Sequence, residues 1–168
     1  MIKKILILIT IIFVTLVTTY ALKLLFFKPF SFNHFLTRQL VYDALESPEY
    51  LTYIGILEKY GYRSYNGKLS DYSLEKDIKD LKKLKKEYKI LNSYENEELS
   101  AEELTSKKIS LFQMRNEIDQ RTKYPYHAYP LIQMNGLHTR ILEFMTDIHP
   151  IKDEKDAKYY LSRLEMIP

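Results

Sequence analysis

The sequence predicts an all-α protein, in which one N-terminal transmembrane helix precedes a helical-bundle-like fragment of about six helices. Three observations support this prediction. The chain opens with an uncharged apolar run, and glycine and proline are scarce, at 4 and 6 of 168 residues. Apolar side chains then recur at spacings of three and four in several later segments. We therefore divide the chain into residues 1–28, an anchor or uncleaved signal, and residues 29–168, a helical fragment.

The opening run, residues 5–22, begins at Ile5, ends at Leu22 and has the length of a membrane span. Its 18 residues correspond to about 27 Å of helix, close to a hydrocarbon core of about 30 Å. A cleaved signal peptide is the alternative, because Lys3 and Lys4 provide a basic start. The sequence Thr19-Tyr20-Ala21 is a poor cleavage site, so we favour a single-pass anchor in contact with the lipid bilayer.

Charge and composition exclude several classes of protein. Residues 1–28 contain four lysines and no acidic residue, whereas residues 29–168 are near neutral. A near-neutral helical part does not favour nucleic-acid binding, and we expect no nucleic-acid partner. The chain has no cysteine, which excludes disulfides and thiol catalysis. Lysines flank the span almost equally and leave its orientation open, but the export-type start favours an extracytoplasmic location for the remainder.

Capping residues mark the beginnings of the next helices. Ser31 can cap a first helix, and Ser47-Pro48-Glu49 combines a cap, a proline at the first position and an acid in the first turn. Gly61 and Asn66-Gly67 then break the periodicity. Their flanks alternate too poorly for a hairpin, so we interpret this stretch as a loop.

Two longer segments predict an antiparallel helix pair. Residues 74–92 follow Ser73 with a single apolar stripe, and residues 101–122 follow a capping box at residues 100–103. The inner face of the second helix is expected to carry Leu111 and Phe112, among others. The lysine-rich run at 82–86 is interpreted as a solvated helix face, in preference to a patch for nucleic acid or acidic lipid.

The last third contains an aromatic loop and two further helices. Residues 124–129 place Tyr124, Tyr126 and Tyr129 around prolines, where they line a ligand groove or fill gaps between helices. A helix is predicted over 137–148, ended by His149-Pro150. Asp153 is predicted to cap a final helix.

No motif predicts a catalytic residue, a metal ligand or a cofactor. The four histidines lack the spacing that places two zinc ligands on one helix face, and we interpret them as capping or surface residues. There is no Gly-x-Ser-x-Gly sequence and no glycine-rich phosphate loop.

The last stretch resembles the N-terminal region of the bacterial "domain of unknown function 885" family. The resemblance rests mainly on His149-Pro150-Ile151 and on residues 156–164, Asp156-Ala157-Lys158-Tyr159-Tyr160-Leu161-Ser162-Arg163-Leu164. Earlier pieces agree in order, including Ser47-Pro48-Glu49 and Leu69-Ser70-Asp71-Tyr72-Ser73. Members of that family are similar to zinc metallopeptidases, with a metal motif downstream of this region, so the resemblance implies a chain truncated before that motif.

The resemblance implies no catalytic residue here and suggests structural or interface roles for Asp156, Tyr159, Arg163 and Leu164. We therefore expect a membrane-anchored, non-catalytic helical fragment of a metallopeptidase-like protein. It is either the product of a split or degraded gene or the partner of a separately encoded catalytic chain. The alternative is a self-sufficient, membrane-anchored binding module that uses the loop at 124–129.

Overall fold

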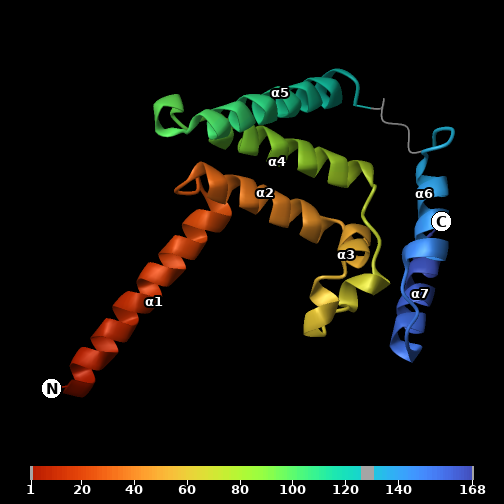
Figure 1. Cartoon of the computed structure of the whole chain (residues 1–168), viewed down its shortest axis with the longest axis horizontal. Coiled ribbons are helices and arrows are strands. Elements are labelled where there is room, and N and C mark those ends of the chain that lie inside the picture. The colour runs from red at the N-terminus through yellow and green to blue at the C-terminus, as the bar shows by residue number, and fades with distance from the viewer. Residues whose placement is uncertain (1, 126–130, 168) are drawn as a thin grey trace. The chain divides into compact units, whose positions relative to one another are not determined.

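A computed structural model describes residues 2–125 and 131–167, and these contain α-helices and short helical turns without any strand (Figure 1). One N-terminal helix is followed by six more, which confirms the predicted fold class. The α-helices are α1 (Ile2–Phe26), α2 (Phe32–Glu46), α3 (Pro48–Ile54), α4 (Leu74–Asn92), α5 (Ala101–Lys123), α6 (Leu137–Glu143) and α7 (Glu154–Met166).

The chain folds into two compact units. The boundary between them falls inside helices α2, α4 and α5, so each of these helices belongs partly to each unit. Unit 1 comprises Met1–Leu40 and Lys83–Asn116, and unit 2 comprises Val41–Lys82 and Glu117–Pro168. Each unit has a core of its own, described below.

Helix α1 is long and apolar enough to cross a membrane over Lys3–Phe26, and none of that span is buried within the protein. Its threonines satisfy their hydroxyl groups internally. Thr10, Thr15 and Thr19 each donate to the carbonyl four residues earlier, at 2.8–3.0 Å. These polar side chains are therefore compatible with an apolar surrounding.

The C-terminal end of α1 is held by cations from two other helices of unit 1. Arg38 of α2 donates to the carbonyl oxygens of Leu24 and Phe27, at 3.2 and 2.5 Å. Lys86 of α4 donates to the Phe26 carbonyl oxygen at 3.2 Å. The last carbonyls of a helix have no partner in their own helix, so these donors satisfy the end of α1 and fix it to α2 and α4.

The core of unit 1 lies among α2, α4 and α5. Phe32 and Phe35 pack with Leu91 and Tyr94, and the Tyr94 hydroxyl donates to the Pro29 carbonyl at 2.9 Å. The capping box of α5 forms as predicted, with Ser100 and Glu103 each accepting from the other's backbone N–H.

One residue predicted for the inner face of α5 lies on its outer face. Phe112 is exposed, whereas Leu111 and Met114 pack against the core of unit 1. Successive residues of an α-helix are about 100° apart, so Leu111 and Phe112 cannot both face the core.

Unit 2 is built from short elements that begin at the predicted caps. The Ser47 hydroxyl accepts from Tyr50 N–H at the start of α3, and the Asp153 carboxylate accepts from Asp156 N–H at the start of α7. The predicted loop contains two single-turn helices, η1 (Leu57–Tyr60) and η2 (Ser64–Gly67). Helices α3 and α7 both pack on η2.

The helix predicted over 137–148 changes type midway. Helix α6 ends at Glu143 and continues as a wider turn, η4 (Phe144–Ile148), which closes with a bond from His149 N–H to the Phe144 carbonyl at 2.9 Å. Phe144 and Met145 of the wider turn and His149, which closes it, are all buried.

Candidate functional site

Arg163 of α7 is completely buried at the centre of unit 2 and is held by neutral acceptors. Its Nε atom donates to the Lys68 carbonyl at 2.8 Å. One terminal nitrogen donates to Thr52 Oγ1 at 2.8 Å and to the Tyr65 carbonyl at 3.1 Å. Among the described residues, no carboxylate forms an ion pair with this guanidinium, and burial lowers the pKa of Arg163 to about 10.

His149 accepts the remaining bond of Arg163. The second terminal nitrogen of Arg163 lies 2.7 Å from His149 Nδ1. Because a guanidinium can only donate, Nδ1 is unprotonated and the ring proton of neutral His149 is on Nε2. Burial and the charge of Arg163 together lower the pKa of His149.

The environment of the His149 ring also favours the neutral form. The ring lies edge-on to Phe144, with centroids 6.4 Å apart, and to Tyr160 at 5.2 Å. Within the described part of the chain, the buried Nε2 atom has no hydrogen-bond partner. A protonated imidazole here would be a second buried cation beside Arg163.

A second layer of polar contacts surrounds Arg163. The buried Asp156 carboxylate accepts from Arg63 at 3.0 Å and from the Lys152 backbone N–H at 3.1 Å. Asn66, completely buried, donates to Glu58 at 3.0 Å. Glu58 also accepts from the Lys152 amine at 2.7 Å. These bonds join η1, η2 and the start of α7 into one network.

The charged and polar groups of this network are bonded to one another. Arg163 donates to backbone carbonyls, to Thr52 Oγ1 and to His149. No serine, threonine or cysteine nucleophile is paired with His149 in the described residues. We name this set of residues, Thr52, Asn66, His149, Asp156 and Arg163, the arginine cluster.

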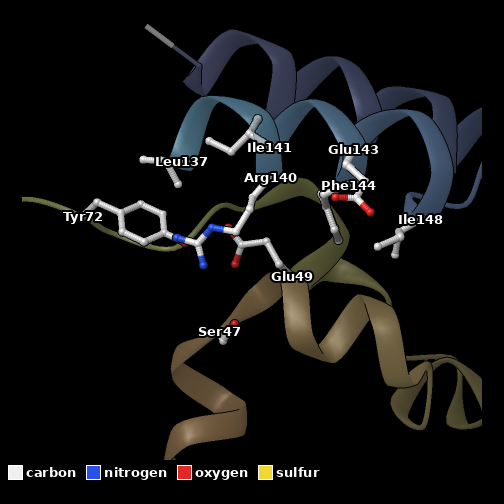
Figure 2. Close-up of a pocket in the computed structure, with 9 residues that line it drawn as sticks. All are labelled: Ser47, Glu49, Tyr72, Leu137, Arg140, Ile141, Glu143, Phe144 and Ile148. Carbon is white, nitrogen blue, oxygen red and sulfur yellow. The ribbon is translucent and has the colours of Figure 1, made fainter. Parts of the chain in front are cut away.

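A pocket of about 330 Å³ lies between the start of α3 and the face of α6 (Figure 2). Glu49 from α3 and Arg140 from α6 point toward one another beside Tyr72. Glu49 also accepts from the backbone N–H and the hydroxyl of Ser70, at 2.8 and 2.5 Å. The apolar wall is formed by Leu137, Ile141, Phe144 and Ile148.

This pocket is suited to binding a small molecule with an apolar body and a polar end. Its polar groups are one guanidinium, the Glu49 and Glu143 carboxylates and the hydroxyls of Ser47 and Tyr72. None of the residues of the arginine cluster lines it. The pocket and the cluster are therefore separate features of unit 2.

The structure brings some of the sequence-predicted residues together and separates others. Asp156 and Arg163 are buried in the arginine cluster, while Leu164 is exposed on the outer face of α7. Tyr159 packs on Gly67 so closely that a Cβ atom there would lie 2.9 Å from its ring. Tyr124 is exposed, and Tyr126 and Tyr129 of the predicted groove lie outside the described residues.

Sequence reasoning missed Thr52, Asn66 and His149. The interpretation of His149 as a capping or surface residue is wrong, because its side chain is buried against Arg163. A signal was present in α7, where Asp156, Tyr160 and Arg163 lie four and three residues apart and share one helix face. Two charged residues on an inner stripe indicate a buried polar network.

The described residues contain no group of three or more histidine, aspartate or glutamate side chains placed to hold a metal ion. His34 and His138 are exposed, and His149 is committed to Arg163.

Comparison with known proteins places most of the chain in a single family. The family model described as "Bacterial protein of unknown function (DUF885)" matches residues 48–168, from the first residue of α3 onward. This region includes every residue of the arginine cluster and of the lining of the pocket except Ser47. No curated protein and no solved structure matches the chain. The match covers well over half of the 168 residues, and the chain therefore belongs to the DUF885 family of bacterial proteins.

Proposed function

We propose that the chain is a membrane-anchored, non-catalytic helical module that provides scaffold for a separately encoded, metallopeptidase-like chain of the same family. The supporting observation is a set of exposed apolar side chains on unit 2. Large apolar side chains stay exposed on α6, on α7 and in the segment between them, namely Leu142, Ile151, Leu161 and Leu164, at 66, 59, 58 and 42 % exposure. Exposed apolar side chains gathered on neighbouring elements are typical of protein interaction sites.

The arginine cluster supports the same proposal from inside unit 2. It fixes α7 against η2 through buried bonds, so Leu161 and Leu164 are presented on a rigid helix. The metallopeptidase-like character of the partner rests on the family resemblance. The non-catalytic role is supported by a buried histidine and arginine that are committed to one another.

Site-specific crosslinking in native membranes tests the proposal. A photo-reactive amino acid at Leu161 is expected to crosslink a DUF885-family chain that carries a metal motif. The control is the same amino acid at Lys79 of α4, whose side chain is 67 % exposed, and it is expected to give no such product. If the probe at Leu161 crosslinks no chain of the family, the proposed binding to a separately encoded partner is wrong. Stoichiometric zinc in the purified chain, or peptide hydrolysis by it, would contradict the non-catalytic role.

The pocket in Figure 2 favours a second candidate function, a self-sufficient binding module. The pocket combines the Glu49 and Arg140 side chains with an apolar wall, and it is the binding surface that this candidate would use. A chain that lacks residues 1–28 is then expected to be monomeric and to unfold cooperatively. Aggregation of that chain would contradict this candidate and agree with an apolar surface that needs a partner.

A further inference from the structure

The two units carry opposite net charge. Unit 1, which contains α1, has twelve basic and six acidic residues and a net charge of +6, whereas unit 2 has a net charge of −3. The acids of unit 1 all lie within residues 87–103. One of them, Glu87, forms a buried ion pair with Arg38. The basic excess of unit 1 is therefore largely uncompensated.

Three lysines of unit 1 gather where α1 ends. The Lys23 amine lies 3.9 Å from the centre of the Phe30 ring. Lys28 donates to the Ser93 carbonyl at 2.8 Å, and Lys86 donates to the Phe26 carbonyl at 3.2 Å. An ammonium group has three N–H donors, and each of the latter two uses one in the described structure. The Lys28 amine also lies 4.4 Å from the centre of the Tyr94 ring. The other donors of the two ammonium groups can bind an anion.

Aromatic rings accompany these lysines. Tyr20 of α1 stacks on Phe30, with ring centroids 5.4 Å apart and planes at 8°. Phe26 and Phe27 are exposed at 57 and 64 %. Aromatic and lysine side chains at the end of an apolar helix are typical of the depth at which the hydrocarbon core meets the headgroups.

No long linker separates α1 from the other helices of unit 1. Only five residues separate the end of α1 from the start of α2, and Arg38 and Lys86 bind the carbonyls of that end. When α1 spans a membrane, the adjoining surface of unit 1 must therefore lie at the headgroups.

We propose that this surface binds the phosphate groups of anionic phospholipids. We name it the lysine collar and define it by Tyr20, Lys23, Lys28, Phe30 and Lys86. The inference rests on the membrane anchor of the proposed function and extends it with a lipid preference. It also assigns a specific role to one residue of the lysine-rich run at 82–86, because Lys86 is held at the end of α1.

A fluorescent probe beside the collar tests the inference in the full chain. The chain has no cysteine, so Ser93→Cys gives a single labelling site, next to the carbonyl that Lys28 binds. The labelled chain is placed in nanodiscs of phosphatidylcholine alone, or of phosphatidylcholine mixed with phosphatidylglycerol. With the anionic lipid, we expect a blue shift of a nitrobenzoxadiazole label and a loss of quenching by acrylamide. High salt should reverse both changes.

Matched variants identify the lysines responsible. The double variant Lys28→Gln and Lys86→Gln is expected to lose the response to anionic lipid, since each lysine near such a surface strengthens association roughly fivefold. The pair Lys28→Arg and Lys86→Arg keeps the charge and should keep the response. Lys79→Gln with Lys158→Gln removes the same charge from unit 2 and should leave the response unchanged.

The outcomes separate the collar from the anchor. If alkaline carbonate releases the chain from membranes, the anchor is wrong. If the chain resists carbonate but the probe responds equally in neutral and anionic bilayers, the anchor stands and the collar is wrong. An undiminished response in the Lys28→Gln and Lys86→Gln variant also overturns the collar. Circular dichroism of each variant confirms that its helices are intact.

Discussion

At the residue scale, Arg163 donates from three nitrogen atoms in three directions, and a lysine cannot reproduce that geometry. Arg163→Lys would leave several of the acceptors among Lys68, Thr52, Tyr65 and His149 buried without a donor. We expect a loss of about 3 kcal/mol in the free energy of unfolding, measured by urea denaturation. Lys158→Gln on the exposed face of α7 is the control, and a comparable loss there would contradict the explanation.

The pH dependence of stability is also a residue-scale prediction. The pKa of His149 is lowered from 6.5 in the folded chain by burial and by Arg163, although Asp156 and Glu58 act to raise it. Below pH 6.5, the unfolded chain binds a proton that the folded chain resists binding. Stability should therefore be full above 6.5 and fall as the pH drops from 6.5 toward the folded-state pKa.

Thermal melting across this pH range checks the sign. His149→Asn keeps an acceptor near Arg163 but removes the titrating ring. The melting temperature of this variant should therefore fall much less than that of the unchanged chain just below pH 6.5. The pKa of Glu58, despite its burial, is held below 4.5 by Lys152 and Asn66, so any loss from that group begins at lower pH. An unchanged decline in the asparagine variant would exclude His149 as its source.

Sequence reasoning identified Arg163 and Asp156 but not their partners. The two residues share one face of a periodic helix, which a local pattern reveals. The partners of Arg163 at Thr52, Tyr65 and Lys68 come from residues about a hundred positions earlier, and no local pattern encodes that convergence.

At the element scale, the cap of α3 supports the helix that contributes Thr52 to Arg163. Ser47→Ala removes the hydroxyl that accepts from Tyr50 N–H, at 3.3 Å. The expected loss in the free energy of unfolding is about 1 kcal/mol. Ser47→Thr retains a capping hydroxyl and should recover most of it; equal losses in both variants would show that the cap is not the cause.

The contact between η2 and α7 depends on the absence of a side chain at Gly67. A Cβ atom there would lie 2.9 Å from Cδ1 of Tyr159, a ring atom that cannot move without the whole side chain. Gly67→Ala should destabilise unit 2 by about 1–3 kcal/mol. The rate of amide hydrogen exchange should rise in α7. Adding Tyr159→Leu to Gly67→Ala should restore part of the lost stability. If it restores none, a clash with the Tyr159 ring is not the cause.

Helix beginnings were predicted better than helix interiors. The caps Ser47, Ser100 and Asp153 act within three residues of themselves, so the sequence alone reveals them. The change from α6 to the wider turn η4 coincides with the burial of Phe144, Met145 and His149 against distant residues. Local periodicity predicts a continuous helix there.

At the scale of the whole molecule, the chain is expected to behave as an integral membrane protein through α1. Ile12→Lys places a charge near the middle of the Lys3–Phe26 span, at a cost of about 2.5–3.5 kcal/mol for insertion. A larger fraction of this variant should be extracted from membranes by alkaline carbonate. Ile12→Leu is the control; equal retention of both variants would argue against a spanning helix.

Composition predicted the helical class and the apolar N-terminal helix, because both are properties of the sequence summed over many residues. The division into two units of opposite net charge was not predicted. It arises because distant segments, residues 1–40 and 83–116, fold together. Lys86 of α4 joins the basic excess of residues 1–28 only in the folded chain.

The bonds from Arg38 and Lys86 to the last turn of α1 have a mechanical consequence. A transmembrane helix adjusts its tilt to the thickness of the hydrocarbon core. Here the 25-residue helix is about 37 Å long, its uncharged run is close to an average core, and its end is bonded to α2 and α4. Thinner and thicker bilayers should therefore hold the rest of unit 1 at different angles to the membrane plane.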